Sequence, residues 1–348
     1  MRFYLLLLIN RFVVCSALIL SFQQLHPLLA QSSVSSFDLE SMINSTIENT
    51  YNYEFRNAIE TTNRMIESYP ARPEGYLYKC GVFWKMSEEG CIDSTDSMRF
   101  EIRILIDKAC QLSAAEIEKN PDDVNALFCY AGALVYRARA EAVSHNWYAV
   151  MSDGIKTRKL LEKVVAVDSN FCDAYSGLGA FNYYAARIPW YLKPIAFVLG
   201  VSGDEKEGVV QLKKAAQLGK YAKVEAAVFL SSVVYVNQGD YSDAAEIMRD
   251  LHGQFPRSLF FLRSLCRDYY EMGNYSETVY YADIALSPDT CSCHRGDIGY
   301  IRFYRGESYE KLNERSKAIA DYEIVAVQNG NEYSGREAKA ALEKLTDK

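Results

Sequence analysis

Apolar side chains recur at spacings of three and four residues from about Glu54 to the end of the chain. Residues 59–66, 104–117 and 209–218 show the spacing clearly, and it is typical of one buried face of an α-helix. Alternating β-branched runs are few, and small residues recur within the apolar segments. Because small residues let two helices approach closely, the pattern predicts an all-α chain of tightly packed helix pairs.

Two short sequence patterns recur along the chain. In the first, a proline or serine of a turn is followed ten residues later by a small residue, as in Pro121 and Ala131. The other three pairs are Pro70 with Cys80, Ser169 with Gly179, and Pro256 with Cys266. In the second, residues 238–244 recur as 272–278 and again as 312–318. The copies begin 34 and 40 residues apart. A repeat of about this length indicates an array of supersecondary units.

The repeated unit resembles the tetratricopeptide repeat, a helix–turn–helix of 34 residues. Its first-helix signature is similar to Tyr175-x-x-Leu178-Gly179-x-x-Asn182, with Asn where an aromatic residue is usual. Its second-helix small, packing and closing positions correspond to Ala244, Leu251 and Pro256, and in the last repeat to Ala318, Tyr322 and Val325, without the proline.

The resemblance implies an α-solenoid of about five or six repeats over residues 55–345, with insertions between repeats. Residues 31–54 are predicted to be a polar linker or a first helix, and the largest insertion falls around 182–204. The final amphipathic stretch, 337–345, is expected to cap the array, since terminal repeats need a polar outer face.

In such an array the first helix of each repeat lines a concave groove. Aromatic residues and arginine are enriched at recognition surfaces, so the groove is the expected site for a partner, although any of its residues could instead pack against neighbouring repeats. The predicted groove residues are Phe128, Tyr136, Tyr183, Tyr184, Phe229, Asn237, Arg263, Arg267, Tyr270, Glu271 and Phe303. The Lys/Asn clamp with which some relatives hold a terminal carboxylate is missing.

The insertion at 186–200 is too apolar for an ordinary solvated loop, and Pro189 and Pro194 disfavour one unbroken helix. Its Trp190, Tyr191 and Phe197 are candidates for contact with a membrane surface, a partner or an apolar ligand. The alternative is that the insertion folds back and covers the solenoid.

The first thirty residues resemble a secretory signal peptide. They contain Arg2 and Arg11, no acidic residue, and an apolar core at 12–22 before Ala30 and a polar run. A signal peptide that is cleaved after Ala30 would direct the chain to the periplasm or outer membrane if the source is a bacterium. In any other source the chain would be secreted. The alternative is an uncleaved anchor, although the apolar run is shorter than the ~20 residues a membrane span needs.

Eight cysteines remain after residue 30, and export would permit disulfides. Cys80 and Cys91 flank an expected helix-hairpin turn and are a candidate pair. Cys291 and Cys293, next to His294, could form structural disulfides, stay as thiols or bind a metal; with no second ligand pair nearby, we expect no metal site.

Composition and motifs exclude several functions. A net charge of −7 argues against nucleic acid as a partner, and the sequence contains no HExxH, GxSxG, GxGxxG or P-loop motif. The sequence therefore predicts a non-enzymatic, cofactor-free exported scaffold or envelope assembly factor that binds a protein or peptide. The alternative is a carrier of lipid or a small apolar ligand that uses the aromatic insertion at 189–200.

Overall fold

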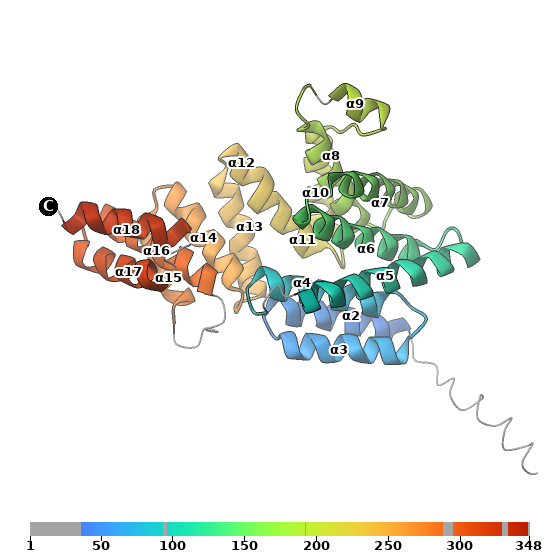
Figure 1. The fold of residues 1–348 in the computed structure, drawn as a ribbon, viewed down its shortest axis with the longest axis horizontal. Helices are drawn as coiled ribbons and strands as arrows, with labels where there is room; N and C mark the ends of the chain where they lie inside the picture. The colour runs from blue at the N-terminus through green and yellow to red at the C-terminus, as the bar shows by residue number, and fades with distance from the viewer. Residues whose placement is uncertain (1–35, 93–95, 192, 288–294, 329–332, 347–348) are drawn as a thin grey trace, which may run out of the picture. The chain divides into compact units, whose positions relative to one another are not determined.

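The computed structural model describes residues 36–92, 96–191, 193–287, 295–328 and 333–346 (Figure 1). These residues form helices and connecting turns, with no β-strand among them. The chain divides after Met42, and the unit that begins at Ile43 contains the second half of α2 and all later helices. The predicted signal peptide lies outside the described residues.

The helices follow one another with short connections. Their bounds are α2 (Ser36–Tyr51), α3 (Phe55–Ser68), α4 (Glu74–Glu88), α5 (Asp96–Lys119), α6 (Val124–Val143), α7 (Trp147–Val167), α8 (Ala174–Ala186), α9 (Lys193–Val198), α10 (Glu205–Leu218), α11 (Lys223–Phe229), η1 (Leu230–Tyr235), α12 (Val236–Gln238), α13 (Tyr241–Gln254), α14 (Leu259–Glu271), α15 (Tyr275–Ala285), α16 (Arg295–Lys311), α17 (Arg315–Gln328) and α18 (Tyr333–Thr346).

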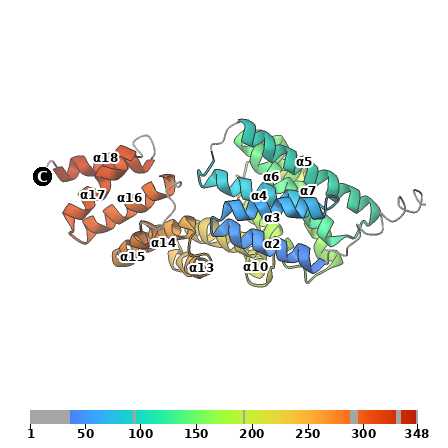
Figure 2. The same cartoon turned by 90° about the horizontal axis from the view of Figure 1, so that it is seen from below.

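Consecutive helices pack as hairpins, which confirms the predicted α-solenoid. Within the described ranges the pairs are α4 with α5, α6 with α7, α8 with α10, α11–α12 with α13, α14 with α15, and α16 with α17. Each hairpin also contacts the next, as α5 does α6 and α7 does α8. Both views show α16, α17 and α18 side by side at the C-terminal end (Figures 1 and 2).

Small residues let the helices of one hairpin touch, as the sequence pattern predicts. A Cβ added to Gly179 of α8 would lie 2.7 Å from the carbonyl oxygen of Gly208 in α10, and one added to Gly208 would lie 2.8 Å from that of Gly179. These distances leave no room for a side chain. The other small residues at this point of their repeats, Cys80, Ala131 and Cys266, are all buried in the core.

The repeated turn motif has the same backbone geometry in each of its three copies. Gly239, Gly273 and Asn313 have φ angles of 78°, 74° and 62°. Glycine and asparagine are the residues that best tolerate this left-handed conformation. Five residues further on, Ala244, Thr278 and Ala318 are completely buried. The three copies are therefore equivalent positions of one repeating unit.

The helix α18 closes the C-terminal end of the array. It packs on α17, with Ser334 and Ala338 fully buried and Tyr333 exposed. The predicted capping helix at 337–345 is thus confirmed. No helix among the described residues is both long enough and apolar enough to cross a bilayer.

The predicted disulfide between Cys80 and Cys91 is wrong for this structure, because the Cys80 thiol is free. Cys80 lies in the middle of α4 and is buried against α5 and α6, whereas Cys91 follows the end of that helix. The rise along α4 separates Cys80 from Glu88 by about 12 Å, and a disulfide needs Cα atoms within ~7 Å of each other. Cys291 and Cys293 lie outside the described residues.

Candidate partner-binding site

The first helices of the N-terminal hairpins bring aromatic side chains together. In α4 and α6, the rings of Trp84 and Tyr136 have their centroids 6.0 Å apart. In α8 and α11, Tyr184 meets Phe229 edge to face at 5.3 Å. Together with Tyr51 at the end of α2 and Tyr78 of α4, these residues form what is called the aromatic cluster below.

A guanidinium group connects the two pairs of rings. Arg139 of α6 lies over Trp84 at 5.9 Å and over Tyr136 at 5.8 Å, and its charge also reaches Tyr184. The indole of Trp84 donates a 2.7 Å hydrogen bond to Glu88, whose carboxylate is 3.9 Å from Arg139. Such cation–π contacts are worth about 0.5–1 kcal/mol at accessible sites. They are therefore strong enough to orient the Arg139 side chain and do not require it to be buried.

A second carboxylate, Glu225 of α11, faces the cluster. Its Oε1 accepts a 2.9 Å hydrogen bond from the hydroxyl of Tyr51, which is 174 residues away in sequence. Desolvation raises the pKa of Glu225, although Tyr51 and Arg139 both act to lower it. The side chain is nevertheless accessible to solvent. The carboxylate thus has protein groups around it while the side chain keeps contact with solvent.

The tyrosines of the cluster are neutral hydrogen-bonding groups. Burial is the main cause that raises the pKa values of Tyr51, Tyr78 and Tyr136, and the carboxylate of Glu225 raises all three further. Each ring therefore keeps its hydroxyl proton and presents both a hydrogen-bonding group and an apolar face. This combination is common at protein recognition surfaces.

A buried aspartate fixes the start of α11 and so the position of Glu225. Oδ1 of Asp173, just before α8, accepts hydrogen bonds from the backbone N–H groups of Lys220, Tyr221 and Ala222 at 2.7–2.8 Å. Phe229 follows Glu225 by one helical turn, on the same face of α11. The π-helical segment η1 comes directly afterwards, and such segments are frequent at functional sites.

The predicted groove residues of α14 occupy a different environment. Arg263 forms an ion pair with Asp297 of α16, and Arg267 pairs with its neighbour Asp268 at 2.7 Å. Tyr270 packs on Tyr304 at 5.5 Å, while Glu271 is exposed. The prediction that both arginines select a partner is not favoured by this arrangement, since each guanidinium already contacts a buried carboxyl group inside the protein.

Three other predicted groove residues are part of the packing between helices. Tyr183 has no exposed surface, Phe303 is buried beside Tyr322, and Phe128 packs on Phe171. Tyr183 and Phe303 are buried and offer little or no surface to a partner, which corrects their expected role as partner contacts. Phe128 keeps part of its surface exposed, and its role as a partner contact stays a prediction. Asn237 is exposed and donates a 3.4 Å hydrogen bond to the Tyr183 hydroxyl.

Six residues of the site were missed from the sequence: Tyr51, Tyr78, Trp84, Glu88, Arg139 and Glu225. Tyr51 belongs to the segment predicted as a linker or first helix, and nothing local indicates that it reaches α11. Glu225 had a usable signal, because it precedes the predicted groove residue Phe229 by four positions on one helix.

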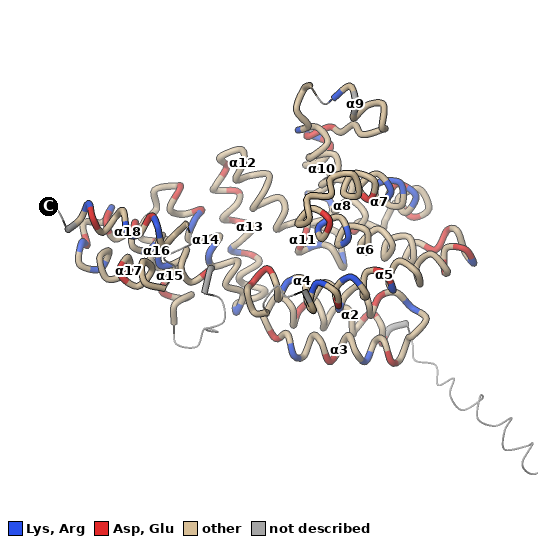
Figure 3. The backbone as a smooth tube through the Cα atoms, viewed as in Figure 1, with Lys and Arg blue, Asp and Glu red and all other residues tan. Residues whose placement is uncertain are grey.

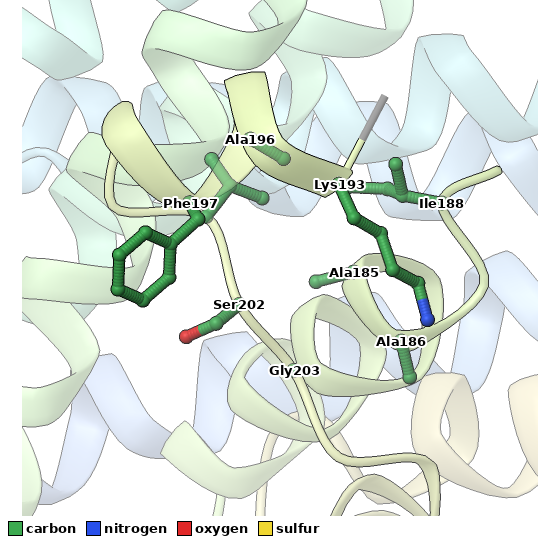
Figure 4. Close-up of a pocket in the computed structure, with 9 residues that line it drawn as sticks. Ala185, Ala186, Ile188, Lys193, Ala196, Phe197, Ser202 and Gly203 are labelled. Atoms are coloured by element: carbon green, nitrogen blue, oxygen red, sulfur yellow. The ribbon is translucent and has the colours of Figure 1, made fainter. Parts of the chain in front are cut away.

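The insertion after α8 leaves its aromatic side chains exposed. Trp190 is 82% exposed and Phe197 77%, and Tyr191 is also open to solvent. The interpretation that this segment folds back to cover the solenoid is therefore wrong. Beneath α9 lies a cavity of about 200 Å³, lined by Ala185, Ile188, Ala196 and Phe197 among others (Figure 4).

A metal-binding group is not assembled in the described parts of the chain. No three His, Cys, Asp or Glu side chains there are placed to hold a metal ion. Burial raises the pKa of the thiols of Cys80, Cys129 and Cys266, so these cysteines are poor nucleophiles.

Comparison with known proteins agrees with this fold. Residues 226–258, from α11 to just before α14, match the family model of the tetratricopeptide repeat. Among solved structures, the chain is similar to the APC/C hetero-tetramer Cut9–Hcn1, with 13% identity, a TM-score of 0.52, and coverage of 91% of this chain and 50% of that one. The chain thus spans half the length of that protein, and the likeness shows a shared fold.

Two bacterial repeat proteins also match over most of their length. A tetratricopeptide repeat protein from Parabacteroides merdae is 13% identical, with a TM-score of 0.33 and coverage of 89% of this chain and 98% of that one. The C-terminal part of a repeat-containing protein from Cytophaga hutchinsonii is 10% identical, with a TM-score of 0.43 and coverage of 85% and 98%.

Proposed function

We propose that this chain is an exported, non-enzymatic interaction scaffold that binds a protein or peptide partner on the aromatic cluster. The observation that carries the proposal is the set of accessible rings that four first helices and the end of α2 present beside Glu88, Arg139 and Glu225. A tetratricopeptide repeat match at 226–258 supports it, because that segment includes Phe229.

Affinity would come mainly from the rings. Aromatic anchors in partly desolvated surroundings dominate the binding energy of protein interfaces, and Tyr184, at 57% exposed, has surface left to bury. The charged groups would fix the orientation and choice of the partner more than the strength of binding. Both Lys/Arg and Asp/Glu positions occur along the hairpins (Figure 3), and the net charge of the chain is −7.

Site-specific photo-crosslinking in the native cell tests this proposal. A benzophenone amino acid replaces Tyr184 in one version of the full chain and Tyr270 in another, and the crosslinked products are identified by mass spectrometry. We expect a discrete partner from position 184 and none from position 270. Crosslinks from position 270 alone would contradict the proposed site.

Export is tested separately, by sequencing the N-terminus of the full chain purified from its own cell. A mature chain that begins at Gln31 supports cleavage after Ala30. An intact N-terminus on protein recovered from the cytoplasm would contradict export and leave the scaffold proposal to the crosslinking result.

A second candidate function is attachment to a membrane surface through the loop around α9. Residues 186–203 carry Arg187 and Lys193 and no acidic residue, and Figure 3 shows no acidic position on α9. Exposed Trp190, Phe197 and Val198 beside basic groups are the composition of interfacial lipid-binding segments. The cavity of about 200 Å³ is smaller than the ~300 Å³ at which ligand pockets begin, so a surface contact is favoured over a lipid carrier.

Sedimentation with vesicles tests this second function. The full chain should sediment with vesicles that contain anionic phosphatidylglycerol and much less with pure phosphatidylcholine, and Trp190→Ala/Phe197→Ala should abolish sedimentation. As a matched control, Trp147→Ala/Tyr148→Ala removes two exposed aromatic residues from the start of α7. Equal loss in both double variants would argue against a specific role for α9.

A further inference from the structure

One carboxylate of the aromatic cluster has no cation of its own. Glu225 is bound by the hydroxyl of Tyr51 and forms no salt bridge with any residue that the structure describes. Arg139, whose charge reaches it, already lies beside Glu88 and on the rings of Trp84 and Tyr136. Glu88, Glu225 and Arg139 together leave one negative charge unbalanced. Lys85, whose Nζ lies 6.0 Å from the ring centroid of Tyr51, forms an ion pair with Glu89 and does not offset this charge.

The groups around this charge are aromatic. Tyr51, Tyr78 and Tyr136 are close enough to interact electrostatically with Glu225. Phe229 lies one turn further along α11, where it meets Tyr184. Ring faces attract cations, and a cation between aromatic rings and a carboxylate is held by both.

We propose that the aromatic cluster receives a Lys or Arg side chain of the partner, which forms an ion pair with Glu225 while its methylene groups lie on the surrounding rings. This inference rests on the proposed function and adds the chemistry of the partner. The ligand is an extended or helical segment with a basic residue at one fixed position, flanked by apolar residues that cover Tyr184 and Phe229.

The same charge disfavours other ligands. A terminal carboxylate or an acidic peptide would meet Glu225 and Glu88 with only Arg139 to compensate, and like charges across an interface suppress wrong partners. Selection among peptides by charge is therefore the measurable consequence of the arrangement.

The test is selection from a phage-displayed library of random dodecapeptides on the immobilised full chain. Selections run in parallel on the wild type, on Glu225→Gln and on Glu246→Gln. Glu246 is an exposed residue of the second helix α13 and serves as the matched control. A Tyr184→Ala/Phe229→Ala variant measures the background that does not depend on the cluster.

We expect wild type and Glu246→Gln to enrich Lys or Arg at one position, and Glu225→Gln to lose this enrichment while it still selects apolar residues. The best wild-type peptide should bind Glu225→Gln about tenfold more weakly, as befits the loss of one charge-assisted hydrogen bond. Peptides without a basic position, or basic peptides that bind Glu225→Gln equally well, would overturn the inference and leave the proposed function standing. Recovery no better than from the Tyr184→Ala/Phe229→Ala variant would overturn both.

Discussion

Two parts of the same array use equivalent helices in different ways. In α4, α6, α8 and α11 the side chains of the first helices form the aromatic cluster, with rings still open to solvent and one carboxylate without an ion pair. In α14 and α16 the corresponding charged residues are paired internally, as in Arg263 with Asp297 and Arg305 with Asp321. The comparison teaches that position in a repeat does not decide function: a side chain is available to a partner only where the array leaves it unpaired.

The largest effect is expected at the residue that connects the cluster to its scaffold. Asp173→Ala leaves three backbone N–H groups without their acceptor, so it should lower the free energy of unfolding by about 3 kcal/mol. It should also weaken partner binding, because α11 loses its fixed start. Denaturant unfolding and peptide titration measure both effects.

Asp173→Asn is the matched variant, since its amide oxygen can still accept the same hydrogen bonds. It should keep most of the stability that Asp173→Ala loses. If both variants unfold alike, the negative charge and not the hydrogen bonding of Asp173 holds α11 in place.

The second effect separates stability from binding in α14. Arg267→Ala removes the cation beside Asp268, which is fully buried and whose pKa burial raises to about 6 while Arg267 lowers it. Leaving that carboxylate unpaired should cost about 2 kcal/mol of stability, with peptide affinity unchanged. A variant that stays stable and loses affinity would return Arg267 to the partner site, as the sequence predicted.

The third effect is a pH dependence at the contact between α4, α14 and α16. Burial raises the pKa of Asp297 to about 7. The charged neighbours of Asp297 are Arg263, Glu89 and Lys85. The pKa of Glu89 is lowered, and its carboxylate is also hydrogen-bonded to Tyr53. Between pH 4 and 7 the folded chain holds a proton on Asp297 that the unfolded chain has lost. Stability from this group therefore falls as pH rises through 7.

The measurement is the difference in unfolding free energy between wild type and Asp297→Asn at pH 5 and pH 8. The wild type should lose on the order of 1 kcal/mol more than Asp297→Asn over this range. Burial lowers the pKa of His252, so its contribution to stability changes with pH in the opposite direction. This contribution is the same in both proteins and cancels in the difference. A difference that grows in favour of the wild type as pH rises would contradict the assignment.

The fold was largely predictable because its signals are local. The turn copies at 239, 273 and 313 and the small residues Gly179 and Ala244 depend on backbone conformation and close approach, both of which leave a mark in the nearby sequence. The number of repeats and the terminal cap follow from the same marks. The Cys80–Cys91 disulfide was predicted wrongly because two positions close in sequence are kept apart by the helix between them.

The candidate site was predictable only in part. Tyr136, Tyr184 and Phe229 were found through their repeat positions, but nothing in the sequence distinguishes exposed Tyr184 from fully buried Tyr183 beside it. The pairing of Tyr51 with Glu225 spans 174 residues, and it depends on how successive hairpins stack. The partner of Arg263, Asp297, is likewise a tertiary contact, so a pattern of first-helix positions could not show this ion pair. The partner of Arg267 is its sequence neighbour Asp268, but only the structure shows that Asp268 is buried.

The comparison of the two regions is tested most directly by titrating one library-selected peptide into matched variants. Tyr184→Ala/Phe229→Ala should weaken binding at least tenfold, because aromatic anchors carry most of an interface's energy. Since Phe229 also packs on buried Tyr183, the titration is run where denaturant unfolding shows that the variant is fully folded. Tyr270→Ala, an equivalent truncation on α14, should change the affinity less than about twofold. Equal losses in both variants, or a loss confined to Tyr270→Ala, would contradict the claim that the partner binds at the aromatic cluster.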